Sequence, residues 1–424
     1  MIYFERGGEQ LSLSDDDLKE GLYIALERFG KVNSALIVPP DITRLHSKAG
    51  ELSCMAYHYL GDACKGVLPA LGTHVPMTYE EKRKMYPDIP LDLFIDHNWR
   101  TDVVTLGEVP AEYVREVSEG KVSFSWPAQV NYHLLENHDL ILSIGQVVPH
   151  EVIGLANYTK NIFVGTGGSE GINKSHYLGA VYGMERMMGR IHTPVRKVMG
   201  YAASHFCREI PILYVLTVLS PDDSGRLVVR GLYIGDDDAC FEKAASLSQQ
   251  VNITYLDQPV DKVVVYLDPH EYRSTWLGNK SIYRTRMAIA DRGELIVLAP
   301  GVKEFGEDAT IDRLIRKHGY KGTPYILAAV EKDNELRENL SAPAHLIHGS
   351  SEGRFTVTYA AGGLSKEEVE SVGFNYMDSD KAIDLYMPED LNAGWKEKNG
   401  ERYYFIPNPG VGLWAWRKKF WEEE

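Results

Sequence analysis

The sequence lacks several features that would place it in common functional classes. Its 424 residues include four cysteines, at 54, 64, 207 and 240, and no two have the CxxC spacing of a zinc or redox motif. The net charge is −15, and nucleic-acid binding needs clustered positive charge. No apolar run is long enough to span a bilayer, and the first residues lack the pattern of a signal peptide. We therefore expect a reduced, cytoplasmic protein that binds neither nucleic acid nor a membrane.

Short apolar runs alternate with helical patterns along the chain. Continuous apolar runs of this length are typical of strands that are buried on both faces of a mostly parallel sheet. They cover residues 34–41, 66–74, 138–145, 160–168, 211–220, 261–269 and 294–301. Helical patterns cover residues 16–30, 48–62, 237–250 and 308–319. This alternation predicts an α/β fold.

The length predicts two α/β domains with mostly parallel sheets and an active-site cleft between them. We place the boundary in the turn near residue 258, which gives an N-terminal cofactor-binding domain, 1–258, and a C-terminal domain, 259–424. The last segment, 394–424, is rich in Trp and Tyr. We expect its aromatic side chains to pack across a domain surface, with a return to the first domain as one possibility.

Polar residues whose side chains could take part in catalysis or binding follow the expected strands. Asp41 and Arg44 follow the first run, His74 the second, and His150 the third. In open α/β sheets ligands bind at the carboxyl ends of strands, so we expect these side chains to share one crevice. Taken alone, any one of these histidines is explained more simply as an ordinary loop residue than as a catalytic one.

A glycine-rich turn, Gly165–Gly171, closes the run at 160–168, which we expect to form a strand preceded by Lys160. Glycines allow positive φ and let backbone N–H groups approach a phosphate. The turn is neither GxGxxG nor a P-loop, so a plain strand-to-helix connection remains the alternative. His176 follows in the expected helix.

Four blocks, in matching order and spacing, resemble the lactate racemase family that uses a nickel-pincer nucleotide. Asp41-Ile42-Thr43-Arg44 is similar to the family's Asp-x-Thr-Arg cofactor motif. Residues 70–78, ALGTHVPMT, are similar to the block that carries one catalytic histidine. His150 matches the second catalytic histidine and Lys160 the lysine that binds the cofactor. His176 matches the metal ligand, and the similarity extends over residues 35–310.

The resemblance implies a covalently attached cofactor, a pyridinium-3,5-bisthiocarboxylic acid mononucleotide that carries nickel. Lys160 would bind it, and His176 would complete a planar nickel site with the cofactor's sulfur and carbon ligands. Asp41 and Arg44 would anchor its ribose and phosphate, with Gly167 and Gly168 lining the phosphate pocket. The implied partners are a small 2-hydroxy acid and the proteins that synthesise the cofactor.

The chemistry implied is inversion of a hydroxyl-bearing carbon by hydride transfer, that is, a racemase or epimerase. The hydroxyl proton needs a base on each face of the substrate, and imidazole titrates near neutrality. His74 and His150 are the residues that the resemblance assigns to this role.

The substrate positions depart from the family. Asn157-Tyr158-Thr159 replaces a glycine-rich stretch, Arg284 replaces a glutamine, and Met287 replaces a lysine. Arg284, with Tyr283 beside it, is our candidate for the substrate carboxylate, and Arg286 is the alternative. Further polar residues that suit a longer polyhydroxy acid such as an aldonate are Trp276, His345 and His348.

Two other functions stay open. An NAD(P)-dependent oxidoreductase would also use an α/β fold and hydride chemistry, but it predicts a GxGxxG turn where this chain has Pro39-Pro40. A non-catalytic sugar-acid binding protein would not need two histidines and a lysine at these spacings.

Overall fold

The structure, a computed structural model, describes residues 1–422, whose contacts divide the chain into two compact units. Unit 1 comprises Met1–Ser175 and Gly189–Asn252. Unit 2 comprises His176–Met188 and the chain from Ile253 onward. The division therefore falls before strand β11 (Ile253–Leu256) and not at residue 258. Each unit is built on an α/β pattern, as the sequence predicts.

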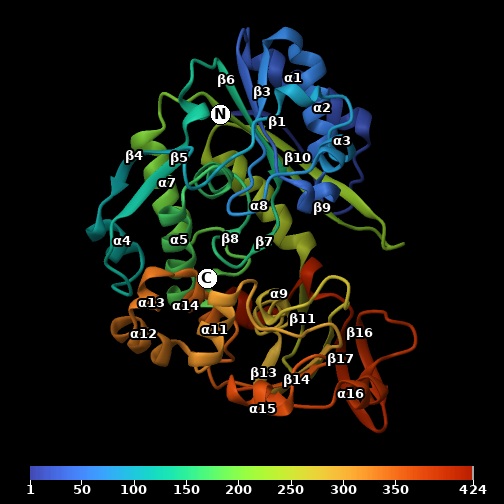
Figure 1. The fold of residues 1–424 in the computed structure, drawn as a ribbon. Coiled ribbons are helices and arrows are strands. Elements are labelled where there is room, and N and C mark those ends of the chain that lie inside the picture. The colour runs from blue at the N-terminus through green and yellow to red at the C-terminus, as the bar shows by residue number, and fades with distance from the viewer. Residues whose placement is uncertain (423–424) are drawn as a thin grey trace. The chain divides into compact units, whose positions relative to one another are not determined.

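A six-stranded sheet, in the order β1-β10-β9-β6-β2-β3, forms the centre of unit 1 (Figure 1). Strands β9, β6, β2 and β3 run parallel to one another, and β10 and β1 extend the sheet in antiparallel pairing. The strands are β1 (Ile2–Gly7), β2 (Ala35–Val38), β3 (Cys64–Val67), β6 (Leu140–Gln146), β9 (Ile212–Pro221) and β10 (Leu227–Gly235).

Helices cover both faces of this sheet. Ser14 and Asp17 form a capping box that starts α1 (Asp15–Phe29), and α1 packs with α2 (Ala49–Leu60) over a core that includes Leu213 and Val215. On the opposite face, α8 (Asp238–Asn252) packs against β9 and β10. Other elements of this unit are α3 (Tyr79–Met85), α4 (Ala111–Val117), α7 (Pro194–Phe206), the ribbon β4 (Val103–Val109) with β5 (Trp126–Asn131), and the hairpin β7 (Pro149–His150) with β8 (Gly154–Leu155).

The expected strand at 160–168 is wrong, because Asn161–Gly165 form a single π-helical turn. The Thr166 hydroxyl donates to the Ile162 carbonyl, four residues earlier, which stabilises helical geometry. Ile162, Phe163 and Val164 are all buried, so the turn presents a short apolar run. Such a run does not distinguish a buried strand from a buried helical turn. After it, α5 (Ser169–Tyr182) begins in unit 1 and passes into unit 2.

The sheet of unit 2 also has six strands, in the order β15-β14-β13-β12-β17-β16. All neighbouring pairs are parallel except β16 with β17. The strands are β12 (Val260–Tyr266), β13 (Ile289–Ala299), β14 (Thr356–Ala361), β15 (Asn375–Tyr376), β16 (Gly394–Lys398) and β17 (Glu401–Ile406). The helices are α6 (Met184–Met187), α9 (Thr275–Gly278), α10 (Lys280–Tyr283), α11 (Ala309–His318), α12 (Thr323–Lys332), α13 (Asn334–Glu338), α14 (Ser341–His348), α15 (Lys366–Ser371), α16 (Ser379–Tyr386) and α17 (Arg417–Glu422).

The aromatic C-terminal segment contributes strands to unit 2. β17 pairs with β12 in the sheet, and β18 (Leu413–Trp416) pairs with β11. Since β11 lies before residue 258, the segment does contact chain that the sequence analysis placed in the first domain, but this strand belongs to the second unit. Among residues 1–422 there is no helix with the length and apolar character needed to traverse a bilayer.

Candidate active site

The carboxyl ends of two neighbouring parallel strands, β2 and β3, bring the first candidate residues together. β2 lies between β6 and β3 in the sheet of unit 1. Asp41 follows β2, and His74 follows β3. Nδ1 of His74 lies 2.7 Å from Oδ2 of Asp41, so these two predicted site residues are in direct contact.

This contact selects the tautomer of a neutral His74 ring. A carboxylate only accepts hydrogen bonds, so Nδ1 of His74 donates and Nε2 of the neutral ring keeps its lone pair. The Asp41 side chain is 7% exposed and the His74 side chain 58% exposed. Burial raises the pKa of Asp41, but hydrogen bonds from His74 and Thr43 outweigh burial and hold that pKa below its ordinary value. The pair is therefore an anchored carboxylate with an accessible imidazole.

His150 has the opposite arrangement of its ring nitrogens. It ends β7, four residues after the end of β6, and its side chain is 13% exposed. The backbone N–H of Val152 donates to Nδ1 of His150 over 3.1 Å. A neutral His150 ring therefore carries its proton on Nε2, whereas His74 carries it on Nδ1.

Lys160 immediately precedes the π-helical turn, which is fastened to the sheet. The Asn161 side-chain amide donates to the carbonyl of Val38, the last residue of β2, and to the hydroxyl of Ser143, within β6. The pKa of Lys160 is lowered to about 8, because burial of the ammonium group and the charge of Arg44 together outweigh Glu151 and Asp41, which raise it. The lysine is therefore within electrostatic reach of both residues of the predicted cofactor motif.

Sequence reasoning missed three members of this group. The charge of Glu151 raises the pKa of Lys160, and the Asn161 side chain hydrogen-bonds the π-helical turn to β2. His46 lies on the same 3-10 turn as Arg44 and hydrogen-bonds Gln146 at the end of β6; burial and the Arg44 charge lower its pKa. His46 stands two residues after the Asp-x-Thr-Arg motif, so its proximity was visible in the sequence.

Gly167 and Gly168, predicted to line a phosphate pocket, are buried and closely packed. A Cβ on Gly167 would lie 1.9 Å from the Phe163 carbonyl oxygen, and one on Gly168 would lie 2.6 Å from the Gln129 side chain. The Gly167 carbonyl accepts a hydrogen bond from Nε2 of buried His97. Close packing therefore already explains why these positions are glycine.

The remaining candidates pack in unit 2. His176 lies on α5, one residue after the division between the units. Tyr283 and Met287 are buried in one apolar cluster, so Met287, where the family has lysine, is a core residue. Arg284 is also buried, and its Nη1 donates to the Gly412 carbonyl. The Arg286 guanidinium binds Glu185 and the Ser350 carbonyl, which gives it a structural role.

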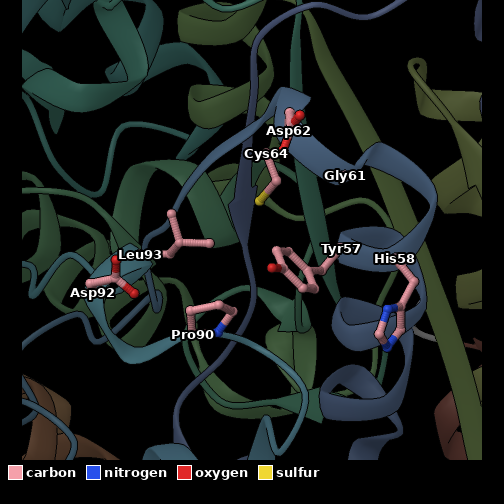
Figure 2. Close-up of a pocket in the computed structure, with 8 residues that line it drawn as sticks. All are labelled: Tyr57, His58, Gly61, Asp62, Cys64, Pro90, Asp92 and Leu93. Carbon is pink, nitrogen blue, oxygen red and sulfur yellow. The ribbon is translucent and has the colours of Figure 1, made fainter.

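A surface pocket of about 430 Å³ lies in unit 1 (Figure 2). Tyr57, Cys64 and Leu93 line it, so it adjoins the start of β3, whereas His74 follows the end of that strand. Burial raises the pKa of the Cys64 thiol to about 11, so this cysteine is not an activated nucleophile.

No group of three or more His, Cys, Asp or Glu side chains among residues 1–422 is arranged to hold a metal ion. A metal in this protein would therefore need ligands that the described side chains do not supply as a preformed cluster.

Comparisons with known proteins show a sequence similarity over part of the chain and two similar solved structures. Residues 25–188 match the family described as the lactate racemase N-terminal domain. A protein of Thermotoga maritima with a crystal structure is 26% identical, with a TM-score of 0.79 over 97% of this chain and 100% of that one. The lactate racemase apoprotein of Thermoanaerobacterium thermosaccharolyticum shares the fold, with a TM-score of 0.72, 15% identity, and coverage of 97% and 94%. No curated protein sequence matches significantly. The sequence similarity to the lactate racemase N-terminal domain covers residues 25–188.

Proposed function

We propose that the chain is a racemase or epimerase that inverts the hydroxyl-bearing carbon of a small 2-hydroxy acid, with a nickel-pincer nucleotide as its cofactor. The observation that carries the proposal is the hydrogen bond from His74 to buried Asp41 beside a lysine of lowered pKa. These residues lie in the part of the chain that matches the lactate racemase N-terminal domain. The family is associated with racemase activity and a nickel cofactor, which supports both parts of the proposal.

The residues present fit this cofactor. A lysine with a pKa of about 8 has a substantial neutral fraction near physiological pH, as attachment through its nitrogen needs. Arg44 supplies a cation beside it for a phosphate, and Asp41 offers a carboxylate for a ribose hydroxyl. His176 would add an imidazole ligand to the metal. When bound, the cofactor supplies the capacity to accept a hydride from the substrate carbon and to return it to either face.

The two histidines would handle the proton of the substrate hydroxyl. Nε2 of His74 has a free lone pair, is exposed, and is held in place through Nδ1 by Asp41, so it can take that proton. Nε2–H of His150 can donate a hydrogen bond to the substrate oxygen. For His150 to take a proton in the reverse direction, the proton on Nε2 must first leave. Inversion in both directions would therefore require the two rings to exchange roles.

Arg284 would bind the substrate carboxylate. Its Nη1 donates to the Gly412 carbonyl, but its buried Nε has no hydrogen-bond partner among residues 1–422. A buried donor without a partner costs free energy, which an incoming carboxylate would recover. Tyr283 stands beside it, with its ring 6.0 Å from that of His348. The polar groups nearby suit a longer aldonate-like acid as well as lactate.

The test measures the conversion of one enantiomer or epimer into the other by the full chain. The chain would be produced together with the cofactor-synthesis proteins, which are its proposed partners in the cytoplasm. A panel of 2-hydroxy acids, from lactate to aldonates, would be followed by chiral chromatography. We expect conversion of one member in both directions, and a loss on the order of 10²–10⁴-fold in His74→Ala and His150→Ala proteins with confirmed cofactor loading.

A substrate deuterated at the reacting carbon separates the remaining possibilities. Hydride chemistry predicts a primary isotope effect with deuterium kept through inversion, whereas loss of deuterium to water would exclude it. Reduction of NAD(P) without cofactor loading would support an oxidoreductase instead. Binding of sugar acids with no conversion in the loaded protein would support a binding protein.

A further inference from the structure

The segment that leads into Lys160 follows an unfavourable backbone path. Asn157 and Tyr158 have φ values of 68° and 60°, in the left-handed region that favours glycine. Two consecutive non-glycine residues there cost free energy and persist only when their surroundings hold them. Asn157 also packs closely against β6, because a Cβ on Gly145 would lie 2.2 Å from the Asn157 amide nitrogen. The conformation of these two residues sets the direction in which the chain reaches Lys160.

One side chain holds this segment at three points. Arg196, in the first turn of α7, donates from Nη2 to the Leu155 carbonyl over 2.5 Å. Its Nη1 donates to the Asn157 carbonyl over 3.1 Å and to the Thr159 hydroxyl over 3.0 Å. These acceptors lie before, within and after the left-handed pair. A planar guanidinium can make this set of contacts, and a lysine ammonium cannot reproduce its fork.

The position of Arg196 is itself well determined. Thr193, which caps α7, donates its hydroxyl to the Ile153 carbonyl, so the start of the helix is fastened to the same segment. The guanidinium lies 4.1 Å from the centre of the Phe241 ring. Burial lowers the pKa of Arg196 to about 9, against Tyr158, Asp238 and Tyr214, which raise it. A buried cation used mainly to bind backbone oxygens is costly, which argues for a specific role.

We propose that Arg196 is a positioning residue for Lys160: it holds residues 155–159 in the left-handed path that delivers the lysine to the carboxyl ends of β2 and β6. The relevance of this position to cofactor attachment rests on the proposed function. The restraint itself does not, because it is a property of the chain without cofactor.

The charges that face Lys160 give the restraint a measurable consequence. Arg44 and Arg196 lower the pKa of the lysine, Glu151 and Asp41 raise it, and burial is the largest influence. If the segment relaxes, the ammonium becomes hydrated and the influence of burial is lost. The pKa of Lys160 would then move from about 8 toward 10.5.

The experiment compares Arg196→Gln and Arg196→Lys with Lys197→Gln, the exposed neighbour on α7, in the full-length chain without cofactor. Trace acetylation across a pH range, read by mass spectrometry, gives the titration midpoint of Lys160. Hydrogen exchange of the peptide spanning 153–160 reports the backbone. Circular dichroism and thermal unfolding show whether each variant folds, and Arg196→Lys serves if Arg196→Gln does not.

We expect both Arg196 variants to raise the Lys160 midpoint by at least about one pH unit, which slows acetylation at pH 7.5 by ~8-fold. Exchange should accelerate in 153–160 and not across unit 1, and Lys197→Gln should change neither readout. Adding Asn157→Gly to Arg196→Gln should recover part of the protection, because glycine adopts positive φ without strain.

A folded Arg196 variant with an unchanged midpoint and unchanged exchange would overturn the proposal. So would accelerated exchange throughout unit 1, since Arg196 would then be a general structural residue. Because no step uses the cofactor, a failure of the racemase assay leaves these outcomes readable.

Discussion

Lys160 should behave as an unusually reactive amine in the protein without cofactor. Its pKa of about 8 lies well below the ordinary value of 10.5. At pH 7.5 this leaves about a quarter of the lysine neutral, against about 0.1% of an ordinary lysine, so its intrinsic rate of acylation should be roughly 200-fold higher. The direction follows from burial of the ammonium group and the nearby charge of Arg44.

The assay is competitive acetylation with a trace of reagent between pH 6 and 11, read by mass spectrometry. Lys197, exposed on α7, serves as the reference within the same molecule. The acetylation rate of Lys160 should rise to half its maximum near pH 8. Because the folded state disfavours the charged form, the free energy of unfolding should also increase as pH rises from about 8 to 10.5.

Two substitutions test the cause of the shift by its sign. Arg44→Gln removes a charge that lowers the pKa of Lys160, so its midpoint should rise. Glu151→Gln removes a charge that raises it, so its midpoint should fall. A wild-type midpoint near 10.5 would refute the argument, and so would movement of both variants in the same direction.

Three further outcomes are expected elsewhere in the chain. Asp41→Asn removes the carboxylate that orients His74, and loss of a charged hydrogen bond worth about 1.5–3 kcal/mol should lower turnover by roughly 10- to 150-fold at constant cofactor loading. Glu185→Ala leaves Arg286, 4% exposed, without its carboxylate, and should lower the free energy of unfolding measured in urea by about 3 kcal/mol. Met287→Lys, which buries an ammonium group in an apolar cluster, should destabilise the chain by several kcal/mol and not create a substrate site.

The fold was accessible to sequence reasoning wherever local pattern and burial agree. The expected strand at 138–145 corresponds to β6 at Leu140–Gln146, and the expected helix at 237–250 to α8 at Asp238–Asn252. The prediction was wrong at 160–168, where an apolar run forms a π-helical turn. Nothing in the run itself marks this, because the Asn161 amide binds Val38 and Ser143, which are distant in sequence.

The division into units shows a second limit of sequence reasoning. Residues 176–188 leave the packing of unit 1 and join unit 2, where Glu185 binds Arg286 and Arg354. Met184 and Met188 join the same apolar cluster as Leu413. A single boundary at residue 258 could not represent this excursion, because the contacts that define it come from residues about 100 to 230 positions later in the chain.

The two histidines show why residue type and spacing alone do not specify chemistry. The sequence places His74 and His150 after two different strands of one sheet, but it does not say which ring nitrogen carries the proton. That depends on Asp41, 33 residues before His74, and on the backbone N–H of Val152, two residues after His150. These partners leave a lone pair on Nε2 of His74 and a proton on Nε2 of His150. Under the proposed reaction the two rings therefore start as unlike groups, one ready to accept the hydroxyl proton and one ready to donate a hydrogen bond. The reverse direction requires the complementary pair of protonation states, so the direction of turnover should depend on which histidine carries the proton when substrate binds.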